Sequence, residues 1–382
     1  MKNYLKSYFK VDGASNMDWK KLLRPKRFYN AAKYALWRNR LPVDAPYYPV
    51  TVMLEISTFC NFQCPACERE LYKTDVASTG GLFRENVKLS EVERLKPLLP
   101  YVYSVYLVAG LGEPFLNSEF WQIVDFLRGF DVKLGYFTNA SLLDEEKIAK
   151  TFEMKINTVL VSMDTHDPEK YEKIKKMSSF EHTVGMIKLL AEYKRRRPSH
   201  PFQLGMNYIF RADNYEDILP YLDFVKGLGV EYVHCSSLIV HIERMKEHSF
   251  FRVPPKEKKR IFELAGEKAG RLGIGLRLPR LDADPSLKCC YPWHGISVFK
   301  GGDVAMCPYF RTDREFYYHV KGDYRVYEED KYVSNTVLGN YLKEDILSIW
   351  NNERTKRIRR GELGLEPHGS PCDACYYKYL LH

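Results

Sequence analysis

The chain has 382 residues, a net charge of +9, 45% hydrophobic residues and 14% aromatic residues. This composition excludes an intrinsically disordered chain, and the length predicts a large domain joined to a smaller one. No apolar run of about 18 residues and no signal-peptide core is present, so we expect a soluble, cytoplasmic protein. In that compartment the nine cysteines indicate metal ligation or catalysis rather than disulfides. The positive charge favours an acidic substrate, an anionic membrane or an acidic partner without deciding among them.

Residues 1–48 are basic and aromatic, and their pattern predicts an amphipathic helix that is interrupted near Pro25. One interpretation is contact with a membrane surface or a substrate carrier. The simpler interpretation is a helix that packs on the main domain.

Six β-rich segments follow, and their apolar character on both faces is typical of parallel strands. They lie at 51–57, 104–110, 132–138, 156–163, 202–210 and 230–237, with helical segments between them at 90–99, 119–128, 144–152, 180–196 and 215–228. This alternation predicts an α/β fold, a partial (β/α)6 TIM-type barrel that is two units short of eight. Active-site groups in such folds lie at the C-terminal ends of the strands.

The alternation stops after a charged helical segment at 255–272. The last part of the chain is rich in loops and contains five of the nine cysteines. We therefore predict a helical N-terminal extension, a partial barrel, a helical linker and a small cysteine-rich domain, at residues 1–48, 49–245, 246–288 and 289–382.

The strongest local pattern is Cys60-Asn-Phe-Gln-Cys64-Pro-Ala-Cys67, directly after the first predicted strand. Three thiolates within eight residues can surround one iron–sulfur cubane and leave one iron without a protein ligand. A zinc knuckle is the alternative, but zinc requires a fourth nearby ligand and no histidine lies in this segment.

This motif resembles the signature of the radical S-adenosylmethionine (SAM) superfamily, and the resemblance extends over about residues 50–240. Gly112-Glu113-Pro114 resembles the element that receives the SAM amino group, although Leu111 replaces its first glycine. Thr138-Asn139-Ala140 resembles a further turn of the family. The resemblance implies that SAM is contacted by Gly112, Glu113, Pro114, Asn139, Ser162, Asp164, Asn207 and Arg211. Ala66 replaces an aromatic residue beside adenine, which leaves Phe62 as the candidate for stacking.

Each of these smaller motifs, taken alone, is more often an ordinary turn, cap or strand end. Their order after successive predicted strands reverses that preference. The resemblance then implies that SAM binds the open iron of a [4Fe–4S] cluster and is cleaved reductively. The resulting 5′-deoxyadenosyl radical abstracts hydrogen from the substrate, while the protein positions the substrate and excludes water.

The C-terminal cysteines resemble those of the SPASM/twitch domain, a β-hairpin plus a helix that binds an auxiliary cluster. Cys289 precedes Gly302 and Cys307, and Cys372-Asp-Ala-Cys375 follows far downstream. The resemblance implies one auxiliary [4Fe–4S] cluster ligated by Cys289, Cys307, Cys372 and Cys375, with Cys290 as the alternative to Cys289. A zinc ribbon is the other interpretation. Tyr379 stands where a further SPASM cysteine would lie, so a second auxiliary cluster lacks ligands.

Cys235, at the end of the sixth predicted strand, faces the barrel mouth in this scheme. It is either a buried structural cysteine or the thiol that returns a hydrogen atom to the substrate radical, as in radical epimerases.

The sequence thus predicts a radical SAM enzyme with oxidoreductase-like chemistry. The favoured reaction is an oxidation, dehydrogenation or bond-forming maturation step assisted by the auxiliary cluster, and epimerisation with Cys235 as donor is the alternative. A non-enzymatic iron–sulfur or zinc-binding scaffold is a different class of function. The substrate is a small molecule, sugar, lipid or peptide, and the electron donor a flavodoxin or ferredoxin. We expect no nucleic-acid partner, because the basic residues are dispersed.

Overall fold

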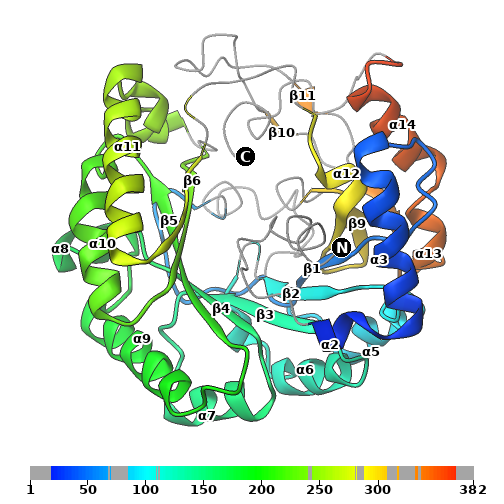
Figure 1. Cartoon of the computed structure of the whole chain (residues 1–382), viewed down its shortest axis with the longest axis horizontal. Coiled ribbons are helices and arrows are strands. Elements are labelled where there is room, and N and C mark those ends of the chain that lie inside the picture. Colours follow the sequence, from blue (N-terminus) through cyan, green and yellow to red (C-terminus); the bar gives the residue numbers. More distant parts are fainter. Residues whose placement is uncertain are drawn as a thin grey trace.

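The computed structural model describes residues 19–67, 69, 85–108, 110, 112–239, 243–279, 281, 288–307, 316–317, 332–333 and 337–366. A ten-stranded sheet in the order β12-β9-β8-β1-β2-β3-β4-β5-β6-β7 curves into an open ring, with helices on its outer side (Figure 1). A separate pair of short strands is formed by β10 (Phe316–Tyr317) and β11 (Tyr332–Val333).

The barrel strands run parallel, and all six predicted strands are confirmed. They are β1 (Thr51–Glu55), β2 (Ser104–Val108), β3 (Lys133–Thr138), β4 (Thr158–Ser162), β5 (Gln203–Phe210) and β6 (Tyr232–Ser237). A seventh parallel strand that the sequence had not indicated, β7 (Gly275–Arg277), pairs with β6.

The connecting helices agree with the predicted segments, with α8 as an addition. They are α5 (Leu89–Val92) with η3 (Glu93–Leu95), α6 (Phe120–Arg128), α7 (Glu145–Glu153), α8 (Pro168–Ile174), α9 (Phe180–Arg195), η5 (Tyr215–Asp217) with α10 (Ile218–Gly227), and α11 (Pro255–Leu272). Shorter 3₁₀ turns are η4 (Pro114–Leu116), η6 (Glu243–His248) and η7 (Phe250–Arg252). N-cap side chains fix where several helices begin, since Asp144, Asp167 and Ser179 each accept a backbone N–H of the first turn.

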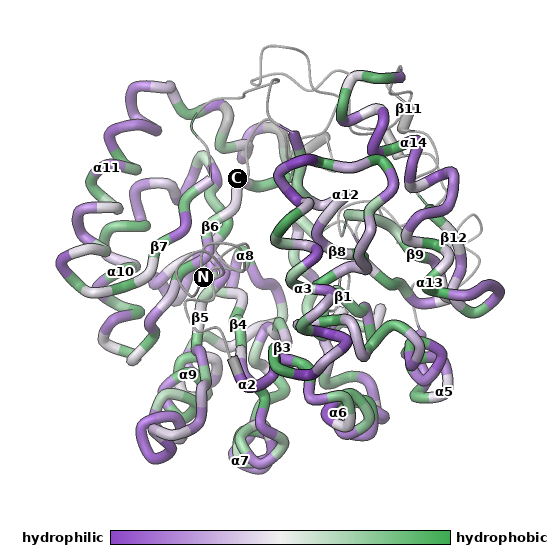
Figure 2. The backbone as a smooth tube through the Cα atoms, turned by 45° about the vertical axis from the view of Figure 1, so that its right-hand side comes forward, coloured by the Kyte–Doolittle hydropathy of each residue, from purple (hydrophilic) through white to green (hydrophobic). Residues whose placement is uncertain are grey.

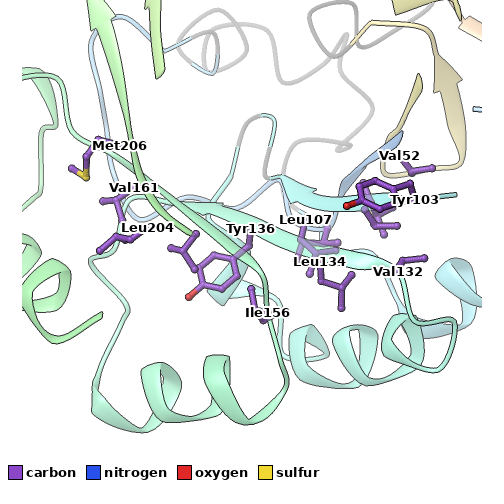
Figure 3. Close-up of a cluster of buried hydrophobic side chains, with 14 of the residues drawn as sticks. Val52, Tyr103, Leu107, Val132, Leu134, Tyr136, Ile156, Val161, Leu204 and Met206 are labelled. Atoms are coloured by element: carbon purple, nitrogen blue, oxygen red, sulfur yellow. The ribbon is translucent and has the colours of Figure 1, made fainter. Parts of the chain in front are cut away.

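Alternate side chains of each strand fill two different layers. One set, which includes Leu107, Leu134 and Met206, points outward and packs between the sheet and the helices (Figure 3). The inward set is more polar than predicted, because Lys133 and Gln203 are buried there.

The start of the barrel interior is closed by large side chains that lie over glycines. A Cβ atom on Gly135 would lie 2.8 Å from the ring of Tyr106, and one on Gly205 would lie 2.5 Å from the side chain of Leu160. Only glycine leaves room for these neighbours. The barrel interior beside these two glycines is therefore filled by neighbouring side chains.

The N-terminal segment forms α2 (Trp19–Leu22), α3 (Pro25–Trp37) and η2 (Arg38–Arg40), so the predicted interruption at Pro25 is confirmed. The helices pack on the barrel through a buried guanidinium. Arg27 donates to the backbone oxygens of Val102, Phe130 and Asp131 at 2.5–2.9 Å, which lie just before β2 and β3. These helices therefore lie across the end of the barrel where the strands begin.

The C-terminal region continues the barrel sheet. It contains α12 (Tyr291–His294), β8 (Gly295–Val298), β9 (Asp303–Ala305), β12 (Val337–Asn340), α13 (Ile346–Ile349) and α14 (Glu353–Glu362). β8 pairs in parallel with β1, and β9 returns antiparallel to β8. The hairpin is thus hydrogen-bonded to the first barrel strand, which the sequence did not indicate. No helix in the described part of the chain is long and apolar enough to cross a membrane.

Candidate active site

The cysteine loop leaves the C-terminal end of β1 and is held by backbone hydrogen bonds. Phe62 N donates to Cys60 Sγ (3.4 Å), Cys67 N to Cys64 O (3.0 Å), and Gln63 N to the carbonyl oxygen of Lys176 (3.0 Å). All three cysteines are partly exposed. The loop thus presents three thiols from one short, internally bonded segment.

Gly112 lies directly against residues 57–59, the segment that leads from β1 into this loop. A Cβ atom at this position would lie 2.4 Å from Ser57 O and 2.5 Å from Phe59 O, so the backbone tolerates no side chain. The next amide, Glu113 N, donates to Phe59 O at 2.6 Å. The Gly-Glu-Pro turn and the cysteine loop therefore form one packed unit.

The side chain of Glu113 connects this unit to the turn after β3. Its carboxyl oxygens accept hydrogen bonds from Thr138 Oγ1 (2.6 Å) and from Asn139 N (2.8 Å). Asn139 in turn donates through Nδ2 to Asn61 Oδ1 (3.1 Å) and lies 3.9 Å from Cys60 Sγ. The first three sequence motifs thus meet around the cysteine loop.

Glu113 gives this site a pH dependence. Burial raises the pKa of its carboxyl group from 4.5 to about 7, although Thr138 and Asn139 lower it in part. Between these two values the folded chain keeps a proton that the unfolded chain releases. The contribution to stability is therefore complete below about pH 4.5 and is lost as the pH rises through about 7.

We expect Glu113→Gln to remove this component of the pH profile. In the wild-type protein, ionisation of Glu113 should lower the unfolding free energy by up to about 3 kcal/mol between about pH 5 and about pH 8. The variant should lack that decrease. Denaturant unfolding of both proteins across this range is the measurement, with Glu169→Gln on α8 as the exposed control. Parallel profiles for the wild type and Glu113→Gln would contradict the assignment.

A buried ion pair lies next to Cys64 of the cysteine loop. Lys175 Nζ lies 2.7 Å from Asp164 Oδ2, and Asp164 Oδ1 accepts Ile209 N at 3.1 Å. Burial raises the pKa of the Cys64 thiol, and the positive charge of Lys175 lowers it in part. The sequence predicted Asp164 but missed Lys175, because nothing local marks a lysine after α8 as its partner.

Three polar residues lie side by side on the inward face of neighbouring strands. Ser162 is paired with Asn207, and Asn207 with His234. Burial and the charge of Arg277 lower the pKa of His234 to about 4, so its imidazole is neutral at neutral pH. The sequence had named Ser162 and Asn207; His234 could have been found from the strand alternation, since it faces the same way as Asn207.

Two other predicted SAM-contacting residues are already engaged within the protein. The guanidinium of Arg211 forms a bidentate pair with Asp213 at 2.8 and 2.9 Å. Phe62 is 4% exposed, so its ring has no open face on which adenine could stack. The position of Phe62 does not support the predicted stacking role.

Cys235 requires a correction. It is paired with Tyr208, whose ring contacts Tyr221 of α10 at a centroid distance of 4.8 Å, and it belongs to the hydrophobic layer between sheet and helices. It is 2% exposed, and burial raises the pKa of its thiol well above the usual value. The prediction that Cys235 faces the barrel mouth is therefore wrong, because its place in the β6 register turns it outward.

Three cysteines of the second set flank the C-terminal hairpin at the same end. Cys289 and Cys290 come just before α12 and β8, while Cys307 follows β9, which runs antiparallel to β8. Cys289 N also donates to Glu362 Oε2 of α14 (3.2 Å). The remaining predicted ligands, Cys372 and Cys375, lie outside the described residues.

The cysteine loop fits an iron–sulfur cluster by its chemistry. Burial raises the pKa of both Cys60 and Cys64, and coordination to iron is what stabilises the thiolate form at such positions. Within the described ranges, no three His, Cys, Asp or Glu side chains lie close enough to hold one metal ion. Three thiols on one short loop are the donor set of a [4Fe–4S] cluster that leaves one iron without a protein ligand.

Comparison with known proteins identifies the family. The model of the radical SAM superfamily matches residues 54–244, and that of the SPASM iron–sulfur cluster-binding domain matches residues 289–376. The chain belongs to the radical SAM superfamily. Its cofactors are SAM, the [4Fe–4S] cluster that binds SAM, and an auxiliary [4Fe–4S] cluster.

The similar proteins carry several names. A tungsten-containing aldehyde ferredoxin oxidoreductase cofactor-modifying protein of Pyrococcus furiosus is 22% identical over 79% of this chain and 80% of its own length. An AdoMet-dependent heme synthase of Methanosarcina barkeri is 25% identical over 86% and 89%. A mycofactocin maturase of Mycolicibacterium smegmatis is 24% identical over 37% and 34%.

Solved structures of the same fold include SuiB of Streptococcus suis bound to S-adenosylmethionine. It has a TM-score of 0.59 and 15% identity, over 87% of this chain and 70% of that one. Native anSMEcpe with bound AdoMet has a TM-score of 0.57 and 15% identity, over 80% and 82%. At these identities the similarity shows the fold alone.

Proposed function

We propose that this radical SAM enzyme carries out an oxidative maturation step on a peptide or on a cofactor precursor. When bound, SAM and its cluster supply the radical that removes hydrogen from the substrate. The turns around Gly112, Glu113 and Asn139 hold the cysteine loop and the SAM amino group, while Ser162, Asn207 and His234 line the inward face where a substrate meets SAM. Cys289 (or Cys290), Cys307, Cys372 and Cys375 would hold the auxiliary cluster, which would supply a one-electron acceptor for the substrate radical as that radical loses a proton.

This proposal rests on the pairing of the C-terminal hairpin, formed by β8 and β9, with β1. Lys300, in the turn between β8 and β9, donates from its backbone N to Glu55 Oε2 at 3.2 Å. Its ammonium group lies 2.9 Å from Glu91. Glu55 is the last residue of β1, five positions before Cys60, so both cysteine-bearing segments are fixed to the same strand. Gly295 of β8 pairs with Thr51 of β1, so Cys289 and Cys307 lie toward the start of β1, while the cysteine loop follows its end. The pairing thus holds the two sets of cysteines at a fixed separation along one strand, which favours electron transfer by way of the auxiliary cluster.

The position of Cys235 argues against the alternative reaction. Epimerisation requires a hydrogen-atom donor next to the substrate carbon. Cys235 is separated from the barrel interior by the sheet itself, and the other cysteines that the structure describes are proposed cluster ligands or, for Cys290, the alternative to one. Removal of an electron by the auxiliary cluster is therefore the better-supported route.

The substrate class rests on the relatives. The names of the relatives describe cofactor modification, heme synthesis and maturation. One of the structural neighbours, SuiB, was solved bound to a precursor peptide. We propose a flavodoxin or ferredoxin as the electron donor, because the SAM cluster needs one electron for each cleavage.

The test uses anaerobic holoenzyme with candidate precursors encoded by neighbouring genes. The expected product is two hydrogens lighter than the substrate and forms equally well with Cys235→Ala. Cys307→Ala should still release 5′-deoxyadenosine but form no product. A product of unchanged mass that carries deuterium from deuterated water would overturn oxidation in favour of epimerisation.

A further inference from the structure

The N-terminal helices bear most of the large apolar side chains that the described protein exposes. Eight large hydrophobic residues are exposed in the described ranges, and five of them lie between residues 23 and 37. They are Leu23 (67% exposed), Phe28 (44%), Tyr29 (63%), Leu36 (70%) and Trp37 (37%). In Figures 1 and 2, α3 lies beside α12, at the part of the ring that contains β1, β8 and β9. We call these five residues the α3 face.

The orientation of α3 is fixed by its opposite side, so this exposure does not come from a loosely attached helix. Asn30 bonds the backbone of Tyr48 in both directions, at 2.7 and 3.0 Å. Tyr34 OH lies 2.9 Å from His294 Nδ1, and Arg27 is buried among carbonyl oxygens. Rotating the helix to bury the α3 face would break all of these polar contacts, which is costly for buried groups.

The surroundings of the α3 face are strongly basic. Residues 19–43 contain no acidic residue. Of their eight basic residues, Arg27 is buried and Lys21 and Arg24 pair with Asp131. The others are exposed or partly exposed: Lys20, Lys26, Lys33, Arg38 and Arg40. Two cations lie against the exposed rings, with Lys33 Nζ 4.5 Å from the Tyr29 centroid and the Arg40 guanidinium 5.0 Å from that of Trp37. Aromatic and aliphatic side chains flanked by lysine and arginine are typical of helices that lie in a membrane interface.

We propose that the α3 face docks the enzyme onto an anionic lipid bilayer. Leu23, Phe28 and Leu36 would enter the boundary between headgroups and acyl chains, while Lys26 and Lys33 pair with lipid phosphates. The 13-residue helix is about 20 Å long and lies flat on the barrel surface, so it can contact a planar bilayer along its length. The other end of the barrel, where the cysteine loop lies, would then face away from the lipid.

Two other possible partners of the α3 face account for fewer of these observations. A redox protein that reduces the SAM cluster would dock at the wrong end of the barrel, because α3 covers the beginnings of the strands and the cysteine loop follows their ends. Transient redox contacts are also small and do not need a row of exposed apolar side chains. A second copy of this chain would bring two strongly basic surfaces together, and that repulsion opposes self-association.

The test is flotation of the anaerobic, cluster-loaded chain with phosphatidylcholine vesicles, with and without phosphatidylglycerol. We expect binding only to the anionic vesicles, and its loss as salt rises from about 0.1 M to about 1 M, where the Debye length falls from about 10 Å to about 3 Å. Lys26→Glu/Lys33→Glu should weaken binding about 25-fold or more, because each basic residue contributes roughly fivefold. Phe28→Ser/Leu36→Ser should weaken it similarly.

The matched controls are on α11, at the far side of the ring. Lys256→Glu/Lys259→Glu changes the net charge equally, and Leu264→Ser removes an exposed leucine (37%). Both should bind like the wild type, and all variants should retain iron and SAM cleavage. Absence of binding, equal binding to neutral vesicles, or equal loss in the α11 controls would overturn the proposal. So would a dimer that the α3 variants dissociate, or an acidic flavodoxin that binds the α3 face without any lipid binding.

Discussion

Simultaneous replacement of Cys60, Cys64 and Cys67 with alanine is expected to halve the iron content, from about eight to about four atoms per chain, and to abolish SAM cleavage. The three thiols lie on one short loop and are partly exposed, whereas the other cluster's ligands come from the C-terminal region. The auxiliary cluster should therefore remain. Iron analysis and release of 5′-deoxyadenosine by the reduced protein are the measurements.

The control for this experiment is Cys235→Ala, which removes a thiol that the structure places in the hydrophobic layer outside the sheet. It should retain all of the iron and full SAM cleavage, at the cost of a small cavity. If the triple variant still produced 5′-deoxyadenosine, or lost all of its iron, the assignment of the two cysteine sets to separate clusters would be wrong.

The sequence correctly predicted the features that depend on residues close together in the chain. Each barrel strand is a short β-rich segment between helices, and the cysteine motif is recognisable by its spacing alone. The turns at Gly112 and Asn139 follow their strands directly, so their order along the chain already predicts that they meet at one end of the barrel. The division of the chain into four segments stays a prediction, and the structure adds that the last of them extends the barrel sheet.

What the sequence did not predict depends on non-local pairing. β8 is four residues long and joins β1 across more than 240 positions of sequence, so no local pattern indicates its partner. Lys175 is one of many lysines, and only the fold brings it to Asp164. Cys235 was misjudged for a related reason. Tyr232 and Val233 are both buried, so the apolar pattern of β6 does not tell which face is inward, and the register with Tyr208 is needed.

Gly112→Ala is expected to weaken SAM binding strongly. The new Cβ would lie 2.4 and 2.5 Å from two backbone oxygens, those of Ser57 and Phe59, which cannot rotate away as a side chain could. The Gly-Glu-Pro turn must then separate from the cysteine loop, and the 2.6 Å hydrogen bond from Glu113 N to Phe59 O is lost. We expect a destabilisation of about 1–3 kcal/mol, the usual range for overpacking.

The same displacement should weaken SAM binding by about tenfold or more, since a loss of about 1.4 kcal/mol at the turn that we propose receives the SAM amino group already has that effect. Equilibrium binding of SAM to the anaerobic protein and thermal unfolding are the measurements. Gly266→Ala on α11 is the matched control, because nothing lies within 4 Å of its added Cβ and alanine favours a helix by about 0.5–1 kcal/mol. That variant should bind SAM normally and be slightly more stable. Normal SAM affinity in Gly112→Ala would show that the turn is not packed on the cysteine loop. Glu113 could then not be the residue that holds Asn139 beside Cys60.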